Sequence, residues 1–160
     1  MRRLFSVVCN EGPSVATAMQ ESTLDVSLRP MVVDDYDAVV ALWRGTDGLG
    51  GVETHEALTR YLARNPGFSQ VAVCGERVVG AILCGHDGRR GYIYRLTVAH
   101  DVRRRGLGRR LVDACLEKLR EECIDHVTLF ILKDNAAAAM FWTELGWVER
   151  VDLRTFAKYM

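Results

Sequence analysis

The chain has 160 residues, which corresponds to one domain at roughly 100–200 residues per domain. Hydrophobic residues make up 49% and charged residues 26%, and these ordinary values exclude a disordered or collagen-like chain. Lys plus Arg and Asp plus Glu are 21 each, so the net charge is zero and a globally basic nucleic-acid binder is not expected.

The cysteines indicate a reducing compartment. They are Cys9, Cys74, Cys84, Cys115 and Cys123, an odd number without C-x-x-C spacing and mostly within apolar runs. This pattern predicts buried thiols instead of disulfides or zinc ligands, and we expect no metal site. No apolar run reaches the ~18 residues of a membrane span, so we expect a soluble, cytoplasmic protein that does not bind membranes.

Residues 1–24 form a poorly specified leader. Arg2-Arg3 resembles a twin-arginine export signal, but the apolar stretch after it runs only from Leu4 to Cys9. An export signal needs roughly 7–15 apolar residues. We therefore expect the folded domain to span residues 25–160.

Periodicity predicts the elements of the first half. Val26 and Leu28 alternate with polar neighbours, which indicates a strand that ends at Pro30, and Asp34 or Asp35 can cap the helix that follows. In chain order, the remaining expected elements are helices to about residue 44 and over 54–63, then three antiparallel strands over 68–74, 78–84 and 92–98.

The second half is expected to alternate helices and strands. The expected elements are a helix over 106–122, a strand over 127–132 that is buried on both faces, a helix from Asn135 to Leu145-Gly146, and closing strands over 147–153 and 155–159. The order β-α-α-β-β-β-α-β-α-β-β predicts one α/β (α+β) domain. Its mixed, mostly antiparallel central sheet is flanked by helices.

A basic, glycine-containing stretch covers the loop before the helix expected at 106–122 and the first turn of that helix. It spans Arg103-Arg104-Arg105-Gly106-Leu107-Gly108-Arg109-Arg110. Helix N-termini carry partial positive charge, so five arginines there oppose the dipole unless an anion sits on the free N–H groups. A solvated basic helix end is the alternative.

The anion is not held by a common nucleotide-binding loop. No Gly-Lys-Ser/Thr follows the glycines, and Leu111 occupies the third glycine position of a dinucleotide fingerprint. The remaining candidate for the anion is a pyrophosphate, which loop and helix amides would hold outside a Rossmann fold.

Two motifs resemble those of the GNAT superfamily of N-acetyltransferases. Arg103-x-x-Gly106-x-Gly108, preceded by Leu96-x-Val98, is similar to its acyl-CoA signature. Asn135-x-x-Ala138-x-x-Phe141-Trp142-x-x-x-Gly146-Trp147 is similar to its second motif. The likeness covers roughly residues 24–160 and implies a GNAT-like fold for the domain.

The resemblance implies an acetyl-CoA site. Its expected residues are Leu96, Thr97, Val98, Arg103, Arg104, Arg105, Gly106, Leu107, Gly108, Arg109, Asn135, Ala138, Phe141 and Trp142. The strand would hold the pantetheine and acetyl group, and the loop amides would hold the pyrophosphate. Asn135 would contact the pantetheine or order its helix. Simple helix packing is the alternative for Ala138 and Phe141.

The candidate catalytic residues depart from the family. Trp142 stands where many relatives have a tyrosine acid, and Tyr92 stands where some have a glutamate. Strand alternation predicts Tyr92 and Tyr94 on the face that Leu96 and Val98 share.

A base could instead come from the loops around the cleft. Glu53 is the main candidate, and His86, Asp87, His55, Glu56 or a water relay are alternatives.

The resemblance implies transfer of an acetyl group from acetyl-CoA to a primary amine by direct attack. A catalytically weak acyl-CoA-binding or sensing module is the alternative, and nucleic-acid binding is not expected. The acceptor is a small-molecule or protein amine that the sequence does not identify. Residues 45–51 and the first two helices are expected to shape its site, and the protein is expected to be a monomer or homodimer.

Overall fold

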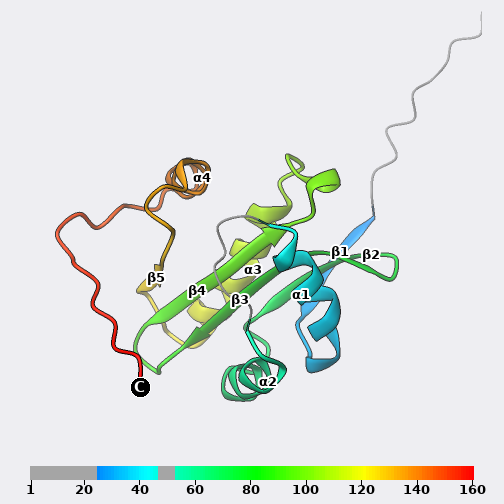
Figure 1. Ribbon diagram of the computed structural model, residues 1–160, viewed down its shortest axis with the longest axis horizontal. Coiled ribbons are helices and arrows are strands. Elements are labelled where there is room, and N and C mark those ends of the chain that lie inside the picture. Colours follow the sequence, from blue (N-terminus) through cyan, green and yellow to red (C-terminus); the bar gives the residue numbers. More distant parts are fainter. Residues whose placement is uncertain (1–24, 47–52) are drawn as a thin grey trace, which may run out of the picture.

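The computed structural model describes residues 25–46 and 53–160, so the leader and most of the glycine-rich loop at 45–51 lie outside the described residues. Strands within this part form one sheet in the order β1-β2-β3-β4-β5 (Figure 1). The first four strands are antiparallel neighbours, and β5 pairs with β4 in parallel. The strands are β1 Val26–Pro30, β2 Gln70–Cys74, β3 Arg77–His86, β4 Gly91–Val98 and β5 Val127–Leu129.

Helices cover both faces of this sheet, which confirms the mixed α/β architecture (Figure 1). Trp43, Leu58 and Ala81 belong to the core between the sheet and the first two helices. Ile93 and Leu111 belong to the core on the opposite face, under α3. The helices are α1 Tyr36–Arg44, α2 His55–Arg64, α3 Leu107–Glu121 and α4 Ala136–Glu144, with 3-10 turns at Val33–Asp35 and His100–Val102.

Asp35 holds the entry to α1. Its buried carboxylate accepts hydrogen bonds from the Val32 N–H at 2.9 Å and from the Arg29 guanidinium at 2.7 and 2.8 Å. The hydrogen bonds from Arg29 hold the pKa of Asp35 below its ordinary value, although burial acts in the opposite direction. Asp35 therefore stabilises the short turn by binding the N–H of its N-cap residue Val32, and its side chain makes no capping bond to α1 itself.

Strand β4 contains a bulge that changes which side chains share a face. Arg95 has a left-handed backbone with φ 53°, and the pairing with β3 shifts between Ala81 and Leu83. Tyr94 packs beside Tyr61 of α2, whereas Leu96 and Val98 pack against the core under α3. The prediction of one shared face was wrong because the extra residue reverses the alternation.

The C-terminal part of the chain differs from the prediction. Strand β5 ends at Leu129, and the apolar residues at 130–132 are exposed. Residues 147–153 and 155–159 form no strand. Arg150 and Asp152 instead form an ion pair at 2.7 Å within a local turn, which competes with an extended conformation.

The cysteine prediction holds for the core and fails at the surface. Cys84 and Cys115 are buried free thiols, whereas Cys123 is exposed with φ 58° just after α3. The parts of the chain that the structure describes contain no helix long and apolar enough to cross a membrane. They also contain no group of three or more potential metal ligands.

Candidate functional site

A gap opens between β4 and β5. Strand β5 pairs only with Gly91, Tyr92 and Ile93, although β4 continues to Val98. The N–H of Ala99 donates to the Val79 carbonyl of β3 at 2.8 Å. Since successive N–H groups of a strand point to opposite sides, the N–H of Val98 points into the gap. The gap therefore offers a backbone donor at the end of β4.

The start of α3 presents free backbone donors. Arg104 and Gly106 have left-handed φ angles of 61° and 74°. The first helical bond runs from the Arg110 N–H to the Gly106 carbonyl at 3.1 Å, so the N–H groups of residues 107–109 have no intrahelical acceptor. Helix N-termini with such free amides bind phosphate groups.

Gly108 lies in the first turn of α3, next to Phe141 of α4. A Cβ placed on Gly108 would be 3.2 Å from the Phe141 ring and 3.9 Å from Val98. A larger side chain here would displace the phenyl ring and cover the adjacent amides. The residue at this position must be small for a ligand to reach the backbone, and the donor set fits a pyrophosphate.

The structure divides the second motif into packing and site residues. Asn135 caps α4, because its side-chain oxygen accepts from the Ala138 N–H at 3.0 Å. Trp142 is only 8% exposed and packs edge-on against Phe141 and Trp147 at 5.2 and 5.0 Å. Phe141 therefore reaches the loop before α3, while Trp142 belongs to the core.

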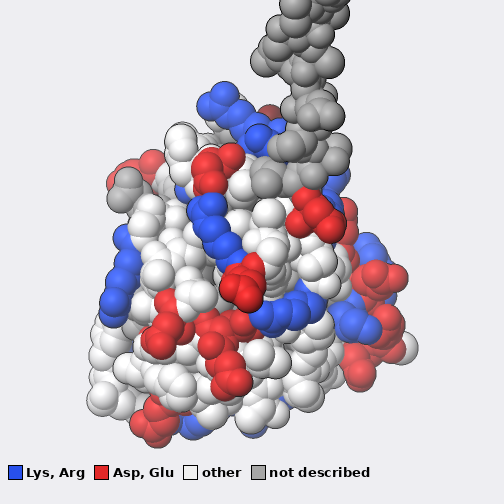
Figure 2. Space-filling model, turned by 90° about the vertical axis from the view of Figure 1, so that its right-hand side faces the viewer, with Lys and Arg blue, Asp and Glu red and all other residues white. Residues whose placement is uncertain are grey.

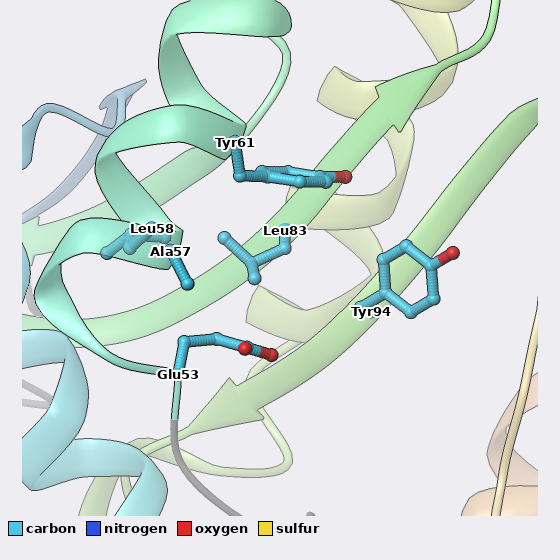
Figure 3. Close-up of a pocket in the computed structure, with 6 residues that line it drawn as sticks. All are labelled: Glu53, Ala57, Leu58, Tyr61, Leu83 and Tyr94. Carbon is cyan, nitrogen blue, oxygen red and sulfur yellow. The ribbon is translucent and has the colours of Figure 1, made fainter. Parts of the chain in front are cut away.

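A pocket opens on the other face of β4, between β3, β4 and α2 (Figure 3). Its volume is about 270 Å³. The lining residues are Glu53, Ala57, Leu58, Tyr61, Leu83 and Tyr94. Two of these, Glu53 and Tyr94, are candidate catalytic residues from the sequence. The other four were missed, because a helix stripe and a buried strand position give no motif.

Glu53 is fixed in this pocket from two sides. Its carboxylate accepts a hydrogen bond from Arg95 Nε at 3.0 Å, and its backbone carbonyl accepts from the Tyr36 hydroxyl at 3.0 Å. The Arg95 guanidinium lies over the Trp43 ring, 5.1 Å from its centroid. The bulge at Arg95 therefore positions the only carboxylate among the described pocket residues.

Two tyrosine rings, Tyr61 and Tyr94, line the pocket, and Tyr92 lies next to Tyr94. Tyr92 stacks on Tyr94 at 6.2 Å, and Tyr61 meets Tyr94 edge-on at 6.5 Å. Burial raises the pKa of Tyr94, and Tyr92 raises it further. Burial also raises the pKa of Tyr61 well above its ordinary value. The phenols of Tyr61 and Tyr94 are therefore neutral near pH 7 and cannot serve as bases.

The other candidate bases have structural partners away from the pocket. His86 accepts from the Gly88 N–H, and Asp87 accepts from the N–H groups of two following residues, so both hold the β3–β4 turn. The His55 ring packs against Tyr36, and Glu56 pairs with an arginine on α2. Of the bases considered from the sequence, the structure places only Glu53 in the pocket.

Surface charge on one face is mixed. Figure 2 shows acidic and basic side chains interspersed among uncharged ones, without a continuous basic surface on the face that it displays. Arg77 and Asp101 form an exposed ion pair at 2.7 Å. This face lacks the basic stripe that nucleic-acid binding requires.

Comparison with known proteins identifies related sequences and folds. Residues 36–147 match the Acetyltransferase (GNAT) family. An acetyltransferase of Pectobacterium atrosepticum is 32% identical over 126 residues, which cover 78% of this chain and 89% of that protein.

Solved structures share the same fold. The crystal structure of Ard1 from Thermoplasma volcanium has a TM-score of 0.70 and 25% identity, and covers 77% of this chain and 82% of that one. A chain of the NatC complex, bound to Gag peptide and CoA, has a TM-score of 0.67 and 20% identity, and covers 78% and 86%.

Proposed function

Because the chain belongs to the GNAT family of acetyltransferases, we propose that it transfers the acetyl group of acetyl-CoA to a primary amine held in the pocket beside Glu53. One observation supports this most strongly. The pocket and the β4–β5 gap share strand β4: Arg95, at its bulge, binds Glu53 of the pocket, and the part of β4 that follows is not paired with β5.

The residues of the cofactor side act through their backbone. When bound, acetyl-CoA supplies an activated acetyl thioester. The N–H groups of residues 107–109 bind its pyrophosphate, with the arginines of the loop adding positive charge. The N–H of Val98 hydrogen-bonds the carbonyl oxygen as negative charge develops there.

Glu53 acts on the acceptor. Its carboxylate pairs with the ammonium group and takes a proton from it, directly or through water, which frees the nitrogen lone pair. A C–N bond forms and the C–S bond breaks, and the second proton that the nitrogen loses passes through water to the leaving thiolate. Trp142 is buried and its indole is only a donor, so the sulfur leaves as a thiolate without a protein acid. A thiol pKa near 8.5 makes this leaving group adequate.

Two assays test the proposal. Acetyl-CoA and CoA should stabilise the protein, by about 2.7 kcal/mol at a concentration ~100 times Kd, whereas NAD should not. Release of CoA thiol should then depend on an added primary amine. A thermal shift with NAD but not with CoA would overturn the proposed cofactor site.

A second candidate function follows from the position of Trp142. Since neither Phe141 nor Trp142 supplies an acid, the same site could bind acyl-CoA without rapid transfer. Stabilisation by acetyl-CoA without thiol release, across primary amines of varied size and charge, would favour this binding module.

A further inference from the structure

The pocket beside Glu53 has one charged group and mostly apolar walls. Leu58 and Leu83 close its base, and the rings of Tyr61 and Tyr94 form its sides (Figure 3). The Tyr61 hydroxyl is buried without a hydrogen-bond partner, so this residue offers its ring and not its hydroxyl to a ligand. A ligand here contacts aromatic and aliphatic surface over most of its body.

The charge of the pocket is small. Glu53 supplies a single carboxylate, and Arg95 already donates to one of its oxygens at 3.0 Å. A second ammonium group on the ligand would find no carboxylate among the described pocket residues, and Arg95 would repel it. The described part of the pocket therefore offers a partner to one positive charge and none to a second.

The helix α2 sets the direction of the bound acceptor. Glu53, just before α2, contacts Arg95, whereas Asn65, just after α2, accepts from the His86 N–H at 2.9 Å. The helix thus runs alongside β4 from the bulge toward the β3–β4 turn. An ammonium group at Glu53 lies at the end nearest Leu96, and the ligand body extends along Tyr94 and Tyr61.

We infer that the acceptor is a compact primary monoamine with an aromatic or other apolar body, and that Ala57 sets how large this body can be. The inference rests on the proposed acetyl transfer and names its substrate class. Ala57 is the smallest side chain that lines the cavity of about 270 Å³. A larger residue there fills the space between α2 and Tyr94.

Phenethylamine and spermidine serve as test probes. We expect kcat/KM for phenethylamine to exceed that for spermidine by at least tenfold at saturating acetyl-CoA. Ala57→Leu should raise the KM for phenethylamine at least tenfold and leave the KM for acetyl-CoA unchanged. Ala63→Leu, an exposed position on the same helix, is the matched control and should change neither value.

Binding of phenethylamine to the CoA complex, measured by calorimetry, separates the two proposals. If phenethylamine binds, Ala57→Leu weakens this binding and no acetyl transfer is detected, the proposed acetyl transfer would be overturned but the inferred ligand class would be retained. Turnover that favours spermidine, or that Ala57→Leu does not alter in a folded variant, would overturn the inference alone. Neither binding nor turnover of any amine would overturn both.

Discussion

The N-terminal end of α3 and the pocket beneath α2 lie on opposite sides of β4 and present different parts of the chain to a ligand. At α3 the donors are backbone N–H groups shaped by two left-handed residues, Arg104 and Gly106. In the pocket the contacts are side chains, and one carboxylate, Glu53, is held by Arg95. A backbone site needs specific glycines, whereas a side-chain site needs only packing partners.

This difference explains how each half can change. If the amides at the start of α3 bind pyrophosphate as we propose, most side chains around them can vary, provided that Gly106 and Gly108 remain. Every substitution in the pocket changes the shape or charge that the acceptor meets. We therefore expect variants at the start of α3 to change acetyl-CoA binding, and variants in the pocket to change the kinetics with the amine.

The largest effect is expected for Gly108→Glu. The new side chain meets Phe141, whose ring lies 3.2 Å from the Cβ position, and adds negative charge beside the pyrophosphate amides. We expect stabilisation by acetyl-CoA to be abolished in a thermal-shift titration. A glutamate at a helix N-terminus is favourable for the helix, so the variant should fold. A folded variant with normal CoA affinity would contradict the assigned cofactor site.

On the acceptor side, Glu53→Gln should lower kcat about 100-fold, because a general base typically contributes 10²–10⁴-fold. The KM for acetyl-CoA should not change, since the carboxylate lies across β4 from the cofactor amides. Steady-state kinetics with a saturating amine measure both constants. Glu56→Gln, which alters an exposed carboxylate paired with Arg60, is the matched control. Equal losses in the two variants would argue against Glu53 as the base.

Asp35→Asn tests the support of α1, which carries Trp43 beneath Arg95. We expect a loss of about 2 kcal/mol at pH 7, from hydrogen bonds between charged groups. Since the folded pKa of Asp35 is lowered, its contribution is complete above the unfolded value of about 3.9 and is lost as pH falls below it. Urea unfolding should show a large difference from wild type at pH 7 that shrinks toward pH 3. A difference independent of pH would refute the role of this charge.

The smallest effect is expected for Tyr61→Phe. The substitution removes a buried hydroxyl that has no partner, so the free energy of unfolding should rise by about 1 kcal/mol. Chemical denaturation of the two proteins measures this change. A clear loss of stability would mean that the hydroxyl has a partner in solution, such as a bound water.

Sequence motifs could point to a cofactor side because the proposed site depends on backbone conformation. Glycines at 106 and 108 and the cap at Asn135 leave recognisable spacing. The acceptor pocket left no such pattern, since Tyr61 and Leu83 occupy ordinary core-facing positions. The prediction that Tyr94 shares a face with Leu96 and Val98 was wrong because the sequence around Arg95 does not indicate a left-handed residue.

The end of the chain was mispredicted for a related reason. The alternation from Val148 to Leu153 is compatible with a strand, but strand formation also needs a neighbouring edge. In the structure, Arg150 and Asp152 form a turn, and β5 has no neighbour beyond it among the described residues. The local sequence pattern alone could not show that the turn forms in place of the strand.

The order of the sheet has a consequence for how the protein assembles. Strands β2, β3 and β4 are joined by tight turns, so they pair at a small cost in chain entropy. Strand β5 can pair with β4 only after α3 has packed across the sheet. Its three paired residues are the last connection expected to form and the first to open. Amide hydrogen exchange should therefore be fastest at β5. A ligand bound between β4 and β5 would slow that exchange, because it would hold β5 in place against the rest of the sheet.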